Sequence, residues 1–233
     1  MPDPDPLAFV CAMPMELRPL TRKLGLRRDT VGGLRTGSLD GRPVVAAVTG
    51  MGTALAAAGI RRLLDAVTPA RVLVVGITGA VDDETVLGTV VRPARVIDAA
   101  SGREHEHHPP DPGPTAGALW TTDVITPADE LPALRARGVV ALDMETAAIA
   151  EACEAGGIPW TVVRAYSDRA TDGSVDDEVF HLSHQDGTPD PAAVARYVLR
   201  HPNRIPTLAR MARTATRATT NAADAAITAA RAV

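Results

Sequence analysis

Short runs of branched apolar residues recur along the chain, separated by Ala-rich or amphipathic segments, and this alternation limits the fold to the α/β class. Leu7 to Ala12, Arg71 to Val75 and Ile158 to Val163 are runs of the kind that form buried strands. Aromatic residues make up only 3% of the chain, so the core must consist of Val, Leu, Ile and Ala, as in buried parallel or mixed sheets. We expect one doubly wound α/β domain over residues 1–233, with a mixed central sheet flanked by helices. Residues 191–233 are expected to form a helical C-terminal extension.

Turn residues and prolines divide the chain into further elements. Additional strands are expected at Leu34 to Leu39 and Pro43 to Val48, paired as a hairpin across Asp40-Gly41, at Thr89 to Ile97, and at Trp120 to Thr126. Helices are expected from Pro14 to before Gly25, at Thr53 to Val67, at Pro127 to Arg137, from Asp143 to about Gly156, and at Pro191 to Val233 with breaks near Pro202 and Pro206. Irregular segments are expected at Gly76 to Gly79 (a turn), Ala99 to Gly117 (a Pro-rich surface loop) and Asp172 to Asp190 (a loop or loose helix).

Composition excludes several classes of protein. The formal net charge of −4 argues against a nucleic-acid partner. The sequence has no run of about 18 apolar residues, so no membrane span is expected. Met1 to Pro6 is acidic and rich in proline, unlike a secretory signal. Cys11 and Cys153 both lie in apolar elements and are expected to be buried, reduced thiols. Together these features predict a cytoplasmic protein.

Acidic residues follow the apolar runs at three places. Glu16 lies just beyond the first expected strand, Glu145 follows Met144 at the start of a small-residue helix, and Asp168 follows Ser167 after another strand. An α/β protein builds its polar site at the carboxyl ends of its strands. A carboxylate whose pKa is raised by burial can act as a general base toward water. The three acids therefore predict a site for acid–base chemistry.

The strings around these acids resemble the nucleoside phosphorylase and nucleosidase superfamily. The chain has Met144-Glu145, Arg164-Ala165-Tyr166-Ser167-Asp168 and Ala12-Met13-Pro14-Met15-Glu16, in the order of the family's landmarks. The resemblance implies that Glu16 activates the attacking water and that Met144 and Glu145 hold the ribose. It further implies that Asp168, held by Ser167, faces the purine and assists protonation of its N7 atom.

Each of these residues also has a structural interpretation. Glu16 could be a solvated acid in the first turn of a helix, favoured by the helix dipole. Glu145 could form a structural ion pair, Met144 could pack in the core, and Asp168 could be a helix N-cap. Asp143 is expected to cap the helix that follows it.

The segment Gly76-Ile77-Thr78-Gly79 resembles the turn that lies under the ribose in this superfamily, which implies that Ile77 and Thr78 contact the substrate. Phosphorolytic members carry an Arg two residues before the first Gly and a Ser or Thr after it, and both bind phosphate. Val74 and Ile77 occupy these positions here. Phosphate requires cationic, multi-donor partners, so the departures predict that water is used instead. An Arg from another subunit would restore phosphate binding.

The base pocket is expected at Thr121 to Thr126. Nucleosidases often show Ser-Gly-Asp-x-Phe-Ile here, so the resemblance implies that Ile125 and Thr126 contact the purine. Ile125 stands where the family has a stacking Phe. This departure leaves the identity of the nucleoside open.

Three histidines, His105, His107 and His108, lie among acids in the Pro-rich segment. Such a set could bind zinc, but a Pro-rich loop offers no rigid geometry. We expect a surface loop, which could cover the site as a lid, and no metal or cofactor.

The sequence therefore predicts a nucleosidase that acts on a 5′-substituted adenosine and releases adenine. The string from Leu199 to Leu208 is similar to the tail of hopanoid-associated phosphorylase-like proteins, which act on an adenosyl-hopane. Cleavage of an adenosylhopane- or futalosine-type nucleoside is thus an alternative, and a non-catalytic nucleoside-binding protein is another. The Ala-rich helix at Thr53 to Val67 suggests a homodimer.

Overall fold

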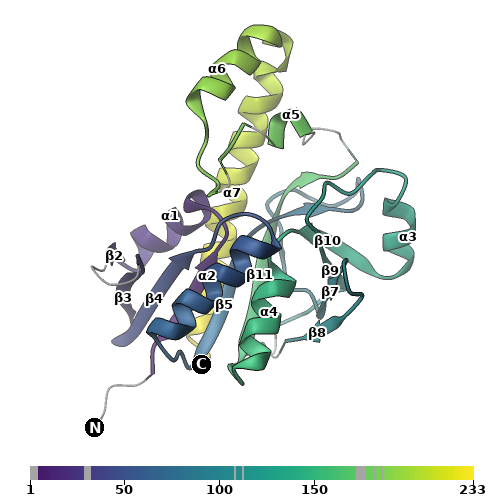
Figure 1. Ribbon diagram of the computed structural model, residues 1–233. Helices are drawn as coiled ribbons and strands as arrows, with labels where there is room; N and C mark the ends of the chain where they lie inside the picture. Colours follow the sequence, from purple (N-terminus) through teal and green to yellow (C-terminus); the bar gives the residue numbers. More distant parts are fainter. Residues whose placement is uncertain are drawn as a thin grey trace.

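A mixed sheet of eleven strands forms the centre of the protein (Figure 1). The computed structural model describes residues 5–28, 33–107, 109–111, 113–171, 177–180, 182–184 and 186–233. The strand order is β2-β3-β4-β1-β5-β10-β9-β7-β8, and β11 pairs with both β5 and β6. The strands are β1 (Leu7–Cys11), β2 (Arg27–Arg28), β3 (Arg35–Leu39), β4 (Arg42–Val48), β5 (Arg71–Ala80), β6 (Val90–Val91), β7 (Arg95–Asp98), β8 (Glu104–Glu106), β9 (Ala118–Thr121), β10 (Val139–Asp143) and β11 (Trp160–Arg169).

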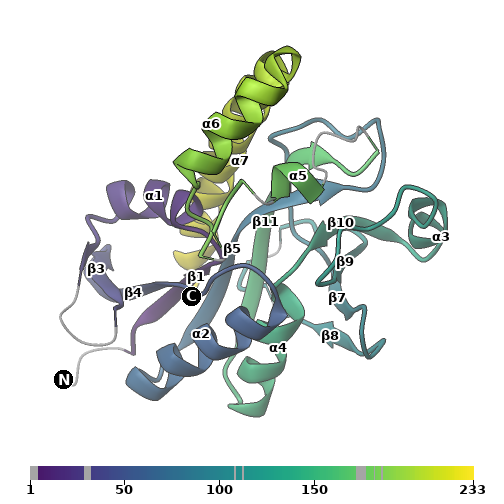
Figure 2. The same cartoon turned by 45° about the horizontal axis from the view of Figure 1, so that its top comes forward.

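Helices cover both faces of this sheet (Figures 1 and 2). They are α1 (Pro14–Lys23), α2 (Thr53–Ala66), α3 (Leu131–Ala136), α4 (Thr146–Ala155), α5 (Asp177–Phe180), α6 (Pro191–Arg200) and α7 (Ile205–Ala230), with a short 3₁₀ turn, η1 (Pro202–Arg204), between the last two. Helices α1 and α7 pack on one face, and α2 and α4 pack on the other. The predicted α/β fold with a mixed central sheet is confirmed.

The central strands are apolar on both faces because both faces are buried. In β1, Ala8 and Val10 face the α2–α4 side, whereas Leu7 and Phe9 face the α1–α7 side. Strand β5 alternates in the same way, since successive side chains of a strand point to opposite faces. All four of these β1 side chains are at most 1% exposed, which explains why the sequence shows continuous apolar runs.

Strand β5 is longer than the sequence predicts. Gly76 to Gly79 was expected to be a turn, but β5 continues through Ala80, paired in parallel with β11. At its far end it also pairs with β10, in the antiparallel sense. Glycine tolerates close approach of other groups, so the two glycines let the strand pass close to neighbouring side chains.

Three other boundaries also differ from expectation. The strand expected at Thr89 to Ile97 is divided into β6 and β7 because Pro93 has no N–H for the ladder. The segment Ala99 to Gly117 contains β8, which pairs with β7, so it is not simply a surface loop. Pro206 lies in the first turn of α7, where its missing N–H costs nothing, so it does not break the helix.

Two expected elements are shorter than predicted. The strand expected at Trp120 to Thr126 ends at Thr121, and the helix expected from Pro127 begins only at Leu131. Their shortening leaves an irregular segment between β9 and α3, and this segment reaches the functional site described below.

Helix α6 and the first half of α7 form a hairpin that projects from the body of the protein (Figures 1 and 2). The second half of α7 belongs to the core on the α1 side, where Ala218, Ala222 and Ala226 are fully buried. Alanine at these positions allows the helix to lie close to β5 and β11. No described helix is both long enough and apolar enough to cross a membrane.

Candidate functional site

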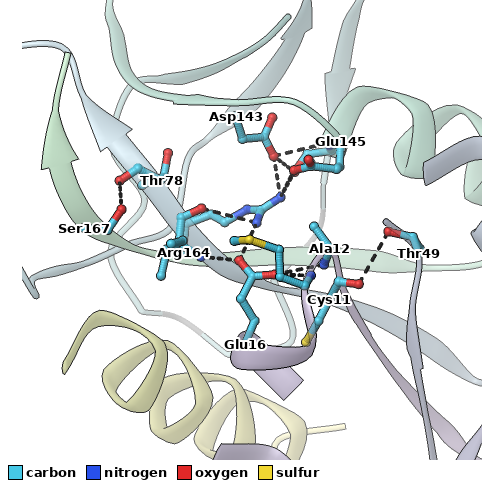
Figure 3. A network of polar contacts seen from close by, with 12 residues as sticks. Cys11, Ala12, Glu16, Thr49, Thr78, Asp143, Glu145, Arg164 and Ser167 are labelled. Carbon is cyan, nitrogen blue, oxygen red and sulfur yellow. Dashed lines mark hydrogen bonds and ion pairs between the residues drawn. The ribbon is translucent and has the colours of Figure 1, made fainter. Parts of the chain in front are cut away.

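Four charged side chains from distant parts of the sequence meet at the middle of β5 (Figure 3). Glu16 comes from α1, Asp143 from the end of β10, Glu145 from the start of α4 and Arg164 from β11. Arg164 lies between the three acids. Each of the four is at most 8% exposed, so the cluster is buried and its charges interact strongly.

The carboxylate of Glu16 is held by backbone N–H groups. Its Oε2 accepts hydrogen bonds from the amides of Ala12 and Met13, both at 2.9 Å, and its Oε1 accepts from Ile77 at 2.8 Å. Burial raises the pKa of Glu16, while Arg164 and these amides act in the opposite direction. Glu16 is only 1% exposed, so the interpretation of it as a solvated first-turn acid is wrong.

Arg164 is the cation of this cluster. Its Nη2 is bonded to the Asp143 carboxylate, donates to Thr146 Oγ1 at 2.8 Å and lies 3.7 Å from Glu145 Oε2, while its Nη1 lies 3.7 Å from Glu16 Oε1. Burial alone would lower the pKa of Arg164, but the three acids raise it. Arg164 therefore stays charged although it is only 1% exposed.

Asp143 fixes the start of α4. Its carboxylate accepts the amide N–H of Thr146 at 3.2 Å and the hydroxyl of Thr121 at 2.7 Å. It thereby satisfies a donor of the first helical turn, as the sequence predicts. The same carboxylate is bonded to Arg164, so the guanidinium group is tied to a fixed point of the fold.

Glu145 adjoins the start of α2. Its Oε1 accepts the amide N–H of Gly52 at 3.1 Å. Burial and the nearby Asp143 raise the pKa of Glu145 to about 8, against the lowering effect of Arg164. The structural ion pair suggested for Glu145 is present, and its partner, which the sequence did not identify, is Arg164 at 3.7 Å. With three acids around one cation, ionisation of Glu145 is disfavoured by its neighbours as well as by burial.

Gly76 makes room for this cluster. A Cβ atom at position 76 would overlap Glu16 Oε1 and Arg164 Nη1. Next to it, Ile77 uses its backbone N–H to bind Glu16, and Thr78 donates its hydroxyl to the carbonyl of Leu142 at 2.7 Å. The glycine is therefore required by the close approach of two charged side chains.

Ser167 and Asp168 lie within β11, beside Gly79 of β5. The register shifts between Tyr166 and Asp168, so Ser167 occupies a bulge, and such bulges redirect side chains. The Ser167 hydroxyl donates to Asp168 Oδ1 at 2.5 Å. No helix starts at Asp168, so its interpretation as a helix N-cap is wrong.

A cavity of about 160 Å³ opens beside Asp168. Residues from four segments line it, including Ile125 and Thr126 after β9, Met144 after β10, Gly79 of β5 and Asp168 of β11. Met144 is half-buried here rather than part of the core. The structure thus brings together four of the residues predicted to contact substrate, Ile125, Thr126, Met144 and Asp168.

The two groups of residues lie along one strand. Gly76 adjoins Glu16 and Arg164, whereas Gly79 adjoins Asp168, and three residues of a strand span about 10 Å. A nucleoside has a comparable length. The buried carboxylate of Glu16 and the carboxyl group of Asp168 therefore lie at opposite ends of a span of this length.

Sequence reasoning did not assign a role to Arg164 or Gly52. Arg164 interrupts an apolar strand, and a charged residue in such a run is almost never fully buried unless it is paired. The occurrence of Arg164 within an apolar run was therefore the sequence feature from which a buried ion network could have been predicted. Gly52 has φ of +89° and offers its N–H to Glu145, and no sequence pattern connects two residues so far apart.

The histidine-rich segment is not an exposed loop. His105 and His107 are 2% and 6% exposed. His105 Nδ1 lies 3.0 Å from Glu154 Oε2, and His107 stacks at 5.4 Å on Trp160. His108 lies outside the described residues. Among the residues that are described, no group of three or more potential ligands could hold a metal ion.

A larger hollow of about 830 Å³ lies between α2 and α4. Small side chains of the two helices line it, including Ala54, Ala57, Ala147 and Ala148. At one end, Asp123 accepts the amide N–H of Thr53 at 2.7 Å, which ties the segment after β9 to the start of α2.

The sequence matches the family model described as the phosphorylase superfamily over residues 6–122 and 114–200. A curated relative, the 5′-methylthioadenosine/S-adenosylhomocysteine nucleosidase of Chromohalobacter salexigens, is 31% identical over 199 residues, which cover 70% of this chain and 84% of that protein.

Several solved structures share the fold. The 5′-methylthioadenosine/S-adenosylhomocysteine nucleosidase of Helicobacter pylori matches with a TM-score of 0.75 at 13% identity, over 99% of this chain and 100% of that chain. The corresponding enzyme of Colwellia psychrerythraea, in complex with adenine, gives 0.70 at 21% identity, over 98% and 95%. Futalosine hydrolase of Helicobacter pylori gives 0.71 at 14% identity, over 96% and 97%.

Proposed function

Since the chain belongs to the phosphorylase superfamily, we propose that it hydrolyses the N-glycosidic bond of a 5′-substituted adenosine of the methylthioadenosine or adenosylhomocysteine type, and releases adenine. The observation that carries the proposal is the buried Glu16 carboxylate, oriented by three backbone N–H groups beside Arg164. A base held in this way, in a relative of a nucleosidase, suits the activation of water.

Glu16 is the general base of this proposal. An ionised carboxylate has about four acceptor positions, and the amides of Ala12, Met13 and Ile77 use three of them. In this proposal a water molecule takes the fourth, on Oε1, which lies 3.7 Å from Arg164 Nη1. Because burial raises the pKa of Glu16, its affinity for a proton is closer to that needed for a base near neutral pH.

Glu145 binds the ribose in this proposal. Cleavage of a glycosidic bond passes through a sugar with positive charge, and an anion beside the ring is more strongly favoured as that charge develops. Arg164 lowers the pKa of Glu145, and the developing positive charge acts in the same direction, so both favour the ionised form of this side chain. Met144 packs against the apolar face of the sugar.

Asp168 assists departure of the purine. Adenine leaves readily only when N7 is protonated, and an acid at N7 lowers that barrier. The short hydrogen bond from Ser167 to Asp168 orients the carboxyl group toward the cavity that Ile125 and Thr126 also line. These two residues contact the base in this proposal.

Water is favoured over phosphate by the residues beside Gly76. Val74 is 1% exposed and packs in the core, so it does not reach a ligand. Ile77 has no polar side-chain atom, and its N–H is already bonded to Glu16. The nearby cation, Arg164, is already engaged by three acids, so a phosphate here would meet the Glu16 carboxylate without the uncommitted cationic donors that it requires.

The purified protein is expected to release free adenine from methylthioadenosine in buffer without phosphate. Chromatography would identify the base and also the sugar product, which is the free sugar after hydrolysis and the 1-phosphate after phosphorolysis. Adenosylhomocysteine, futalosine and an adenosine with a long apolar 5′ group complete the panel and report the preferred substituent. Absence of base release from every member, with and without phosphate, would overturn the proposal and favour a nucleoside-binding protein.

Asp168→Asn is expected to lower kcat by about 10²- to 10⁴-fold, the usual contribution of a positioned acid, and to leave the fold intact. The amide keeps the size of the side chain and can still accept from Ser167, but it cannot supply an acidic proton. Asp224→Asn, on the exposed face of α7, is the matched control. Unchanged turnover of Asp168→Asn with normal circular dichroism would remove Asp168 from the mechanism.

The protein also acts as a homodimer in this proposal, in the cytoplasm. The hollow between α2 and α4, lined by alanines, suits a second copy. Cys11 and Cys153 are free and buried, which accords with a reducing compartment. Light scattering that gives the 24.3 kDa mass of one chain at micromolar concentration would contradict the dimer.

A further inference from the structure

The hairpin of α6, η1 and the first half of α7 has an unusual charge. Residues 191–217 contain six arginines and no acidic residue, although the whole chain has a formal net charge of −4. In α7, Arg210, Arg213 and Arg217 are spaced by three and four residues and so share one face. In α6, Arg196 and Arg200 share a face in the same way. These five arginines are exposed.

Three of these exposed arginines have no acidic partner among the residues that the structure describes. Within the described part of the chain, Arg200, Arg210 and Arg213 make no ion pair. Among the described residues, Glu178 contacts the hairpin, and its Oε2 lies 3.4 Å from His201 Nε2. A partner of negative charge is therefore complementary to the hairpin.

Large apolar side chains lie at the tip of the hairpin. Leu199 is 83% exposed and Ile205 is 47% exposed, on either side of η1. The tip is nevertheless well packed underneath, because buried Tyr197 accepts a hydrogen bond from Arg204 Nε at 3.1 Å and stacks on His201 at 4.8 Å. The fold therefore holds two apolar side chains in solvent. They flank the turn between α6 and α7, which is the end of the hairpin farthest from the body (Figure 2).

We propose that this hairpin docks the protein on an anionic lipid surface, with Leu199 and Ile205 inserted at the boundary of headgroups and acyl chains and the arginines against the headgroups. Segments that lie in a membrane interface typically combine exposed apolar residues with flanking arginines. A nucleic acid would be complementary to the charge but would leave Leu199 and Ile205 in water. A second copy of this chain, which has a net negative charge, would match the positive charge of the hairpin. No surface that would receive Leu199 and Ile205 is identified on the described residues.

Flotation with vesicles tests this proposal. The full chain is expected to float with vesicles of phosphatidylcholine containing phosphatidylglycerol, to stay in solution with phosphatidylcholine alone, and to be released by salt. The triple variant Arg200→Gln, Arg210→Gln, Arg213→Gln should bind about 100-fold more weakly, since each arginine near an anionic surface is worth about fivefold. Leu199→Ser should weaken binding about tenfold.

Matched controls lie elsewhere on the surface. Arg61→Gln with Arg62→Gln on α2, and Val233→Ser at the far end of α7, change similar exposed residues and should bind vesicles like the unmodified protein. Circular dichroism of all variants checks that the fold is retained. Loss of binding in the controls, or equal binding to neutral vesicles, would overturn the proposal.

A label at the tip separates the possible partners. Cys11 and Cys153 are buried, so Leu199→Cys can be labelled selectively with a polarity-sensitive dye. Anionic vesicles should shift its emission to the blue, whereas single-stranded RNA or DNA and an excess of the unlabelled protein should not. A blue shift with unlabelled protein alone would show contact between copies, and binding of RNA or DNA in preference to vesicles would show a nucleic-acid site. Either result would overturn the proposal.

Discussion

Arg164→Met is expected to destabilise the protein by about 3 to 5 kcal/mol near neutral pH, the usual cost of removing one partner from a buried ion pair. Arg164 is 1% exposed and is the only cation in contact with Glu16, Asp143 and Glu145 among the described residues. Methionine has a similar length but no charge, so it leaves three buried acids without compensation. Urea denaturation followed by circular dichroism measures the change.

The loss should depend on pH in a defined direction. Arg164 lowers the pKa of both Glu16 and Glu145, so in Arg164→Met these pKa values rise further. A carboxyl group whose pKa is higher in the folded state than in the unfolded state binds a proton on folding, and stability then falls as pH rises. For Glu145 this window runs from its ordinary value of 4.5 to about 8. In the variant this fall continues above about pH 8, so the deficit relative to the unmodified protein should be smaller at about pH 5 than at about pH 9.

Two variants complete this test. Arg164→Lys keeps a positive charge but lacks the forked guanidinium group, so it should lose less stability than Arg164→Met. Arg61→Met changes an exposed arginine of α2 and should be nearly neutral. A loss of Arg164→Met that is the same at both pH values would show that lost packing, and not the uncompensated acids, is responsible.

The central strands and most helices could be predicted because their signal is local. The apolar runs of β1 and β11 mark buried strands, and Pro14 and Gly25 bracket α1. The predicted ends of elements were wrong where a tertiary contact overrides the local sequence pattern. Gly76 and Gly79 predict a turn, but pairing with β11 keeps them in β5. Side chains of other elements occupy the space that the two glycines leave.

The individual acids of the site could also be picked out, since each follows an apolar run. Their mutual arrangement could not, because it depends on Arg164 and on backbone N–H groups that no side-chain pattern reveals. His105 and His107 show the opposite error. Prolines and charges in their segment suggested solvent exposure, whereas both rings are buried, His105 in β8 paired with β7 and His107 against Trp160.

Glu16→Gln is expected to lower kcat by about 10²- to 10⁴-fold and to change KM little. Glutamine keeps the shape of the side chain, but it cannot accept a proton from water. Its NH₂ group would also face N–H donors, because both oxygens of Glu16 accept from backbone amides. A moderate fall in melting temperature should therefore accompany the loss of activity. Glu104→Gln, an exposed change on β8, is the control.

The pH profile of the unmodified enzyme gives this prediction a second readout. Because Glu16 must be ionised to act as a base, kcat/KM should rise with pH as Glu16 loses its proton. Burial raises its pKa above the ordinary value of 4.5, so the rise should occur at higher pH than for an exposed glutamate. The residual activity of Glu16→Gln should lack this limb, since its amide does not titrate. A variant that keeps both the limb and most of its activity would assign the base to another residue, and Glu145, whose pKa is about 8, would be the next to replace.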